Sequence, residues 1–574
     1  MTRKTQIFPR LNWLLNYQRE YLSGDLIAGM IVTVMLVPQS MAYAQLAGLP
    51  PQTGIYASIV PLFIYGLLGS SRALAVGPVA IVSLMVGAGI SQFNPQNLSQ
   101  YLNLAITLAL LVGIIQVVMG ILRAGFLVNF LSHPVLTGFI NAAAIVIAVS
   151  QLRHLTGIIT PRTEHTYETL LYIFKHLNQI NWLTVIIAGL SIGILLYFKY
   201  GLHHRLKQWN MPAIWMIPIT RSAPLVVVVL GVFIVVLFHL DSKIAIVGHV
   251  PAGLPSITVP VLDWHTWQRL LPTAITIALI GFMESISVAK SLASKKREKV
   301  YANQELIAIG VANLGAAFTG AYPVAGGIGR SVVNFSAGAN TGLASIITAI
   351  LMTITVMFLT PLFYYLPQAV LASIIIVAVI GLIDLSVFKH TWNYNRADAI
   401  SLIVTFFTVL FIGVETGIIL GVSVGLILFL WRTSQPHVAI VGQVGETEHY
   451  RNVLRHDVTT YPHIIAMRVD ESLYFPNAQY LEAILLETIV DNPDVKHLVL
   501  ICSAVNYIDT SALEVLDALV KELRDAGVGF YLAEVKGPVM DKLKKIGFID
   551  HLGEENVFLS THQAMCMLKQ HGRF

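Results

Sequence analysis

Long, nearly charge-free apolar runs fill this chain as far as Trp431 and then stop. A helix needs about 20 mainly apolar residues to cross a hydrocarbon core of about 30 Å. Only 12% of the residues are charged, about half the share of roughly 25% found in soluble proteins. After Pro436 the composition becomes that of an ordinary soluble domain. The pattern therefore predicts a polytopic α-helical membrane protein with a soluble C-terminal domain.

The apolar runs predict fourteen spans. Eleven are long, and three are shorter or interrupted. The long ones are 26–44, 102–121, 135–149, 183–198, 225–240, 273–289, 305–321, 343–362, 369–383, 399–412 and 416–431, and the others are 54–69, 78–90 and 326–340. Lys and Arg gather in the loops on one side, which places both chain ends in the cytoplasm. We expect an N-terminal segment 1–25, a transmembrane domain 26–432 and a cytoplasmic domain 437–574.

An internal repeat relates the two halves of the membrane part. Adding 245 to Pro78 gives Pro323, and both open the tripeptide Pro-Val-Ala. The same offset carries Gln39 to Glu284. The repeats would cover about 26–240 and about 270–432. Because each holds seven spans, an odd number, the second must be inverted in the membrane, an arrangement known in secondary transporters.

Two interrupted segments predict an anion site. Gly77 and Pro78 disfavour a continuous helix, and Pro is favoured at a first helical position, so we expect a short helix starting at Pro78. Three glycines and Pro323 precede a second short helix around Arg330. Each helix N-terminus carries about half a positive charge, and Arg330 adds a planar fork of donors suited to oxyanions. The alternative is that the glycines serve packing and that Arg330 reaches the membrane surface.

Glu284 lies near the middle of an otherwise apolar span. A carboxyl group inside a membrane is costly and marks a functional position by default. It would be a protonated acid, a partner of Arg330 or a cation ligand.

The motifs in these segments resemble those of the SulP sulfate permeases, and most closely the plant-type branch. They are Val37-Pro-Gln-Ser-Met-Ala-Tyr-Ala-Gln-Leu-Ala-Gly-Leu-Pro50, Gly77-Pro-Val-Ala80, Asn303-Gln-Glu-Leu-Ile-Ala-Ile-Gly310 and Tyr322-Pro-Val-Ala-Gly-Gly-Ile-Gly-Arg-Ser-Val-Val-Asn334. The resemblance implies a fold shared with nucleobase transporters, with core and gate domains, and a homodimer. Substrate would lie between the third and tenth helices. By motif position, Gln39, Tyr43, Ala80, Gly327 and Ser331 would line its pocket with Arg330. For Gln39 and Tyr43 the alternative is a polar contact between helices.

The resemblance also bears on energy coupling. Sodium-coupled members tend to have Asp where this chain has Glu284, with hydroxyl residues where it has Val288 and Ile328. Sodium prefers several hard oxygen ligands, whereas protonation needs only the carboxyl group (by analogy with other hard cations). We therefore expect proton symport with Glu284 as the proton carrier, ahead of sodium coupling or exchange.

The C-terminal part alternates strand and helix patterns. Strands are expected at 463–469, 497–503 and 528–534, and helices at 478–490, 511–526 and 539–546. Tyr507-Ile-Asp-Thr-Ser-Ala-Leu513 resembles the signature of STAS domains, in some of which the residue matching Ser511 is phosphorylated. The alternative is that Asp509 caps a helix and Ser511 lies in its first turn.

These features predict a secondary active importer of a small anion, with sulfate expected, in a bacterial inner membrane. A bicarbonate or dicarboxylate carrier or exchanger of the same family is the alternative, followed by an anion channel or a signalling platform built on the STAS-like domain. The pattern holds no nucleophile–base pair, phosphate loop, metal cluster or nucleic-acid-binding stripe, so no enzyme activity, cofactor, metal or nucleic acid is expected. Cys502 and Cys566 are predicted to be free thiols.

Overall fold

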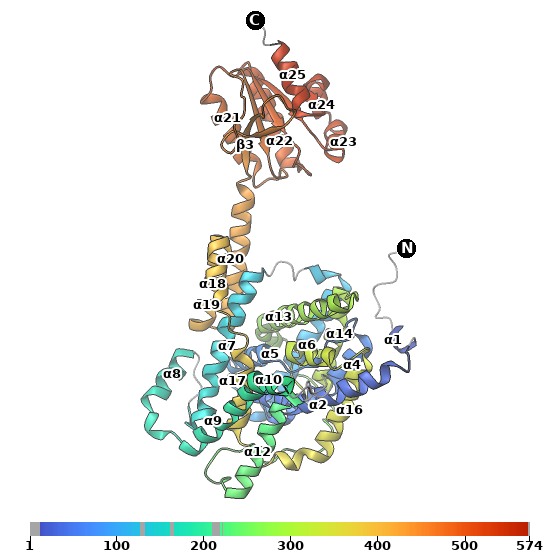
Figure 1. Ribbon diagram of the computed structural model, residues 1–574, viewed down its shortest axis with the longest axis vertical. Helices are drawn as coiled ribbons and strands as arrows, with labels where there is room; N and C mark the ends of the chain where they lie inside the picture. Colours follow the sequence, from blue (N-terminus) through green and yellow to red (C-terminus); the bar gives the residue numbers. More distant parts are fainter. Residues whose placement is uncertain are drawn as a thin grey trace. The chain divides into compact units, whose positions relative to one another are not determined.

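The computed structural model of the chain describes residues 12–15, 17–126, 132–160, 166–208, 219–220 and 222–571. It divides into two compact units, residues 1–425 and 426–574. Figure 1 follows the chain through both. Each unit is described by itself below.

Every predicted span coincides with a helix or a pair of consecutive helices. These are α2 (Tyr21–Leu46), α3 (Pro51–Tyr56) with α4 (Val60–Leu68), α5 (Ala80–Ser91), α6 (Leu98–Ile121), α7 (His133–Thr156), α9 (Trp182–Leu196), α12 (Ala223–Phe238), α13 (Trp264–Lys296), α14 (Ala302–Phe318), α15 (Ile328–Ser336), α16 (Leu343–Ile354), α17 (Gln368–Ile380), α19 (Arg396–Phe411) and α20 (Val414–Ser434). The other α-helices that the structure describes in this part are short, namely α1 (Asn12–Leu15), α8 (Thr166–Lys175), α10 (His203–Gln208) and α18 (Ser386–Tyr394). Among the described residues, eight helices are long and apolar enough to cross a membrane alone.

The membrane helices pack in two groups. One group contains α2, α4, α5, α6, α13, α14, α15 and α16, and the other contains α7, α9, α12, α17 and α19, with α2 in contact with α12 and α17 where the groups meet. In the first group, α6 and α14 approach closely because Gly113 and Gly310 face each other's helix. A Cβ atom on Gly310 would lie 2.8 Å from the backbone nitrogen of Val117. Both short helices of the predicted anion site, α5 and α15, belong to this group.

The second unit is an α/β domain around a six-stranded sheet, and its order is β4-β3-β5-β6-β7-β8. The strands are β3 (Val438–Gln443), β4 (Tyr450–Asn452), β5 (Ile464–Val469), β6 (His497–Ile501), β7 (Gly529–Ala533) and β8 (Val557–Phe558), and the helices are α21 (Ala478–Val490), α22 (Thr510–Asp525), α23 (Gly537–Lys545), α24 (Phe548–Leu552) and α25 (Thr561–His571). Strands β5 to β8 are parallel, whereas β3 pairs antiparallel with both β4 and β5.

Both faces of this sheet are covered by helices. The apolar residues of α21 and α22 pack on one face, and those of α25 pack on the other. The three predicted strands correspond to β5, β6 and β7, and the three predicted helices to α21, α22 and α23. The sequence analysis did not predict β3, β4 and β8. Cys502 and Cys566 are both free thiols, as predicted.

Candidate functional site

Two short strands meet inside the membrane unit. Strand β1 (Val76–Gly77) pairs antiparallel with β2 (Ala325–Gly326), with Val76 opposite Gly326 and Gly77 opposite Ala325. All four residues are buried. Extended backbone at membrane depth must satisfy its polar groups within the protein, and these strands do so partly through each other. The pairing places the starts of α5 and α15 next to one strand pair, although they are far apart in sequence.

The first short helix begins later than predicted. Helix α5 starts at Ala80, two residues after Pro78, because Val79 keeps extended angles of φ −132° and ψ 148°. Helix α15 starts at Ile328 after the extended Gly327. Valine and glycine have no side-chain acceptor, so neither helix has a side-chain cap. The first-turn N–H groups of both helices are thus left for another acceptor.

Arg330 joins the two strands. Its side chain is buried, and it donates hydrogen bonds to the carbonyl oxygens of Ala75 (2.7 Å), Pro78 (2.6 Å) and Ala325 (2.9 Å). A guanidinium group has five N–H donors, so these three bonds leave two. The sequence analysis expected the guanidinium fork to face an anion, whereas here it holds three backbone carbonyls. Its positive charge nevertheless lies at the junction of the two helix starts.

Ser331, Ala80 and Gly327 are all at this junction. The Ser331 hydroxyl donates to the carbonyl of Gly327 (2.7 Å) and accepts from the backbone N–H of Ala75 (2.9 Å). It therefore braces the strand pair, and it is fully buried. Ala80 is the first residue of α5. Gly327 has no room for a side chain, because a Cβ atom there would lie 2.9 Å from the Arg330 guanidinium carbon.

Helix α13 supports the same strand pair from another side. The hydroxyl of Ser285 donates to the carbonyl of Gly281 and accepts from the backbone N–H of Gly326 at 2.7 Å. Since Ser285 is bonded to β2, its neighbour Glu284 is held close to the junction.

Glu284 and Gln39 both have an unpaired buried oxygen. Within the described part of the chain, neither Oε2 of Glu284 nor Oε1 of Gln39 has a hydrogen-bond partner. Nε2 of Gln39 donates to the Tyr43 hydroxyl at 2.9 Å. Tyr43 interacts electrostatically with both Glu284 and Arg330. Buried polar atoms are nearly always paired in folded proteins, so unpaired ones call for a ligand, water or proton.

Polar residues that the sequence analysis did not single out hold the surrounding frame. Glu305 is fully buried and accepts hydrogen bonds from the Tyr65 hydroxyl (2.7 Å), from the backbone N–H (2.7 Å) and hydroxyl (2.6 Å) of Ser70, and from the Ser71 N–H (3.1 Å). Asn313 on α14 bonds to Gln116 on α6 and to both backbone groups of Val324. Glu305 is the first residue of the predicted span 305–321 and lies in the first turn of α14, so a rule that looks for a carboxyl group in the middle of a span does not single it out.

Ser511 lies in the second unit. It is the second residue of α22 and is exposed. Asp509 is the N-cap, and its Oδ1 accepts from the backbone N–H of Ala512 at 2.8 Å, which is the alternative weighed for this segment. The helix start leaves Ser511 accessible, and its phosphorylation stays a prediction.

Comparison with known proteins gives the family. The model of the sulfate permease family matches residues 22–405, and that of the STAS domain matches residues 455–564. Sulfate transporter 4.1, chloroplastic, of Arabidopsis thaliana is 36% identical over 98% of this chain and 83% of its own length.

Solved structures share the fold. The murine Solute Carrier 26 family member A9 anion transporter in the inward-facing state superposes with a TM-score of 0.89 at 25% identity, over 99% of this chain and 96% of that one. The transmembrane domain of a cyanobacterium bicarbonate transporter, BicA, gives 0.59 at 24% identity, over 72% of this chain and 98% of that one. These matches confirm the predicted fold class, and the family is one of transporters, not enzymes. The chain belongs to the sulfate permease family and has a STAS domain in its C-terminal part.

Proposed function

We propose that this chain imports a small oxyanion, with sulfate as the first substrate, by proton symport. The anion would lie between the first turns of α5 and α15, and Glu284 would carry the coupled proton. The observation that carries the proposal is the meeting of two uncapped helix starts at a buried strand pair, next to the charge of Arg330. The name of the Arabidopsis relative, a sulfate transporter, supports sulfate.

Charge balance favours a divalent anion. Each helix start contributes about half a positive charge and Arg330 contributes a full one, which together approach two charges. In this arrangement Arg330 acts through its charge and by fixing both helix starts, while the first-turn N–H groups bind the anion. Those N–H groups would replace part of the hydration shell that sulfate loses in the protein.

Gln39 and Tyr43 would complete the pocket from α2. The Tyr43 hydroxyl accepts from Gln39 and keeps its own proton for another acceptor. Rotating the Gln39 amide by 180° would exchange its oxygen and nitrogen. The two N–H donors would then occupy the buried position of Oε1, and the Tyr43 hydroxyl would donate to Oε1 in its new position. Either orientation presents donors, which an oxyanion requires.

Glu284 supports the proton as coupling ion. An ionised carboxylate oxygen that is buried without a partner is much more costly than a neutral acid. Binding a proton therefore relieves that cost, and binding an anion next to Arg330 removes part of the attraction that favours the ionised form. Anion and proton would thus bind together, which is the requirement for symport.

The test is uptake of labelled sulfate into proteoliposomes under imposed pH and sodium gradients. Wild type should accumulate sulfate when the outside is acidic, with no response to sodium. Glu284→Gln should lose accumulation driven by the pH gradient yet still exchange sulfate across the membrane. Glu168→Gln, the same substitution on the peripheral helix α8, is the control. Full pH-driven accumulation by Glu284→Gln would refute proton carriage by this residue.

Competing anions distinguish the cargo. Excess selenate should block uptake because it shares the charge and tetrahedral shape of sulfate. Stronger inhibition by bicarbonate or a dicarboxylate would show that this anion, and not sulfate, is the preferred substrate. The proposed position of the site would be unaffected. Large single-channel currents in planar bilayers would show that the protein is an anion channel and not a carrier.

The arrangement in the membrane is also a proposal. The bias of Lys and Arg between the loops supports both chain ends in the cytoplasm, and the family resemblance supports a homodimer. The relatives that support sulfate are plant proteins, and one is named chloroplastic, so they give no support to the expected bacterial inner membrane.

A further inference from the structure

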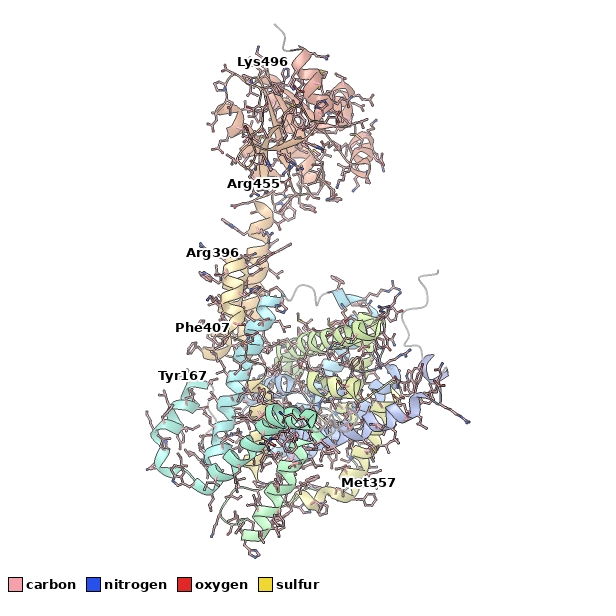
Figure 2. All side chains as sticks on the ribbon, viewed as in Figure 1. Tyr167, Met357, Arg396, Phe407, Arg455 and Lys496 are labelled. Carbon is pink, nitrogen blue, oxygen red and sulfur yellow. The ribbon has the colours of Figure 1, made fainter. Side chains whose placement is uncertain are left out.

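The second unit contains a basic hollow that the proposed transport function does not use. Its cavity volume is about 240 Å³, and we call it the basic pocket. Its lining residues are His437, Arg451, Asn452, Arg455, His456, Arg468 and Asp470. Figure 2 shows Arg455 at one end of this unit and Lys496 at the opposite end.

Three strands build the pocket. Arg468 on β5 lies opposite Ala439 of β3, and Asn452 on β4 lies opposite Val441 of β3. Positions two apart on a strand share a face, so Arg468 and Asn452 are on the same side of the sheet. The backbone N–H of Asp470 donates to the carbonyl of His437, which fixes the edge where β3 begins.

A tight turn after β4 forms the other side of the basic pocket. The carbonyl of Asn452 accepts from the backbone N–H groups of Arg455 and His456, and its side-chain oxygen accepts from that of Leu454 at 2.7 Å. Arg455 and His456 are therefore fixed next to Asn452 by the backbone. Backbone hydrogen bonds thus fix where these residues leave the chain, while the side chains of Arg451, Arg455 and His456 are exposed.

The charges of the pocket are unbalanced. The Asp470 carboxylate accepts two hydrogen bonds from Arg468, of 2.6 and 3.1 Å, and is hydrogen-bonded to Nδ1 of His437 at 2.7 Å. In the part of the chain that the structure describes, Arg451 and Arg455 have no ion pair and no acceptor for their guanidinium groups. Three arginines against one aspartate leave a formal charge of +2 with both histidines neutral.

Size and charge together point to a phosphate ester. A volume of 240 Å³ equals about eight water molecules at about 30 Å³ each. A phosphate group with five heavy atoms would leave room for the group to which it is esterified. A phosphate monoester carries a charge between about −1.5 and −2 at pH 7, and arginine forks bind its oxygens in pairs.

One lining residue of the pocket follows the last apolar helix closely in the sequence. Helix α20 ends at Ser434, three residues before His437. Trp431 and Arg432 in its last turn are residue types typical of a membrane–water interface. A phosphate could thus arrive on a lipid headgroup or on a soluble molecule.

We propose that the basic pocket is a binding site for a phosphate monoester, in which Arg451 and Arg455 bind the phosphate oxygens and Arg468 is held in place by Asp470. The site lies outside the residues assigned to transport, so it stands whether or not the proposed function holds.

The test uses the full chain in lipid nanodiscs with two probes. The lipid arm adds phosphatidylinositol 4-phosphate to phosphatidylcholine nanodiscs and counts bound lipids by native mass spectrometry. The soluble arm titrates AMP, a water-soluble phosphate monoester, onto nanodiscs of phosphatidylcholine alone by calorimetry. Wild type should bind in at least one arm, and the arm that responds identifies the source of the phosphate.

Charge-matched variants locate the site. Arg451→Gln with Arg455→Gln should weaken binding about tenfold or more, since each removes a charge-assisted hydrogen bond. Lys496→Gln with Lys521→Gln removes the same charge from exposed positions elsewhere in the unit and should leave affinity unchanged. Arg451→Lys with Arg455→Lys, which keeps the charge and loses the forks, should bind with intermediate affinity. The proposal fails if wild type binds neither probe or if both Gln pairs weaken binding equally.

Discussion

Nη1 of Arg330 donates a hydrogen bond of 2.6 Å to the carbonyl oxygen of Pro78, a contact that joins the second repeat to the first across 252 sequence positions. Two further bonds from the same guanidinium reach Ala75 and Ala325. One side chain thus fixes both strands of the pair and, through them, the starts of α5 and α15. The geometry of the proposed anion site depends on this clamp.

Arg330→Lys should abolish uptake and lower the thermal unfolding temperature. An ammonium group cannot reach three carbonyls on two strands, and each buried group left unpaired costs about 1–3 kcal/mol. Arg72→Lys, at an exposed position, should change neither quantity. Unfolding of purified protein in detergent measures the effect. A variant with unchanged unfolding temperature and only a raised KM would mean that Arg330 is solely an anion ligand.

Gly327→Ala should damage the same clamp without removing any donor. The added Cβ atom would lie 2.9 Å from the Arg330 guanidinium, which cannot swing away without breaking its three hydrogen bonds. We expect a loss of uptake of at least about tenfold, because a shift of about 1.4 kcal/mol suffices for that factor. Gly189→Ala on α9, where nothing lies within 4 Å, is the matched control and should transport normally.

Gln39→Leu should raise the KM for sulfate with little net change in stability, because removal of an unpaired buried oxygen offsets the lost hydrogen bond to Tyr43. The substitution removes donors from the proposed pocket, and it also removes a buried oxygen that has no partner in the described structure. Gln45 on the same helix has an unpaired oxygen too, so Gln45→Leu should match the stability change without the change in KM. Equal KM changes in both variants would count against a binding role for Gln39.

Glu305→Gln should lower stability and leave proton coupling intact in the protein that remains folded. The carboxylate accepts four hydrogen bonds, and an amide would turn an N–H group toward at least one of these donors. Two donors that face each other cannot form a hydrogen bond, so we expect the free energy of unfolding to fall by about 2–4 kcal/mol. Glu20→Gln at an exposed position is the control. Glu284→Gln should show the reverse pattern, with coupling lost and stability kept.

Asp470 makes the stability of the second unit depend on pH. Burial alone would raise its pKa, but hydrogen bonds from Arg468 and His437 outweigh burial and hold the pKa below the ordinary value of 3.8. A carboxyl group whose pKa is lower in the folded state stabilises above the unfolded pKa and loses that contribution as pH falls through the folded one. Hydrogen exchange of β3 and β5 in the full chain should therefore be faster in Asp470→Asn at neutral pH. That difference should begin to shrink only below about pH 4 and vanish once the pH is below the lowered pKa of the folded state, and Asp550→Asn should show none.

The membrane spans and the soluble α/β pattern could be read from the sequence because both are local. Hydropathy over some 20 residues identifies a span, and the period of apolar residues separates β5 and β6 from α21 and α22. The motifs around Pro78 and Glu284 also lie in segments that the structure brings to one strand pair, and their roles in transport stay predictions. The predicted start of α5 was wrong by two residues. The preference of proline for a first helical position takes no account of the extended backbone of Val79 or of the hydrogen bond from Arg330 to Pro78.

The sequence by itself determined where the helices break and which polar residues enter the membrane, since apolar periodicity, Gly and Pro act within a few residues. Only the tertiary structure decided what those residues bind. Arg330 and Ser331 hold backbone groups around residue 75, about 250 positions away, and Glu305 holds Ser70 and Ser71. Such pairings depend on how the two inverted repeats pack, because a buried donor takes whichever acceptor the packing brings within reach.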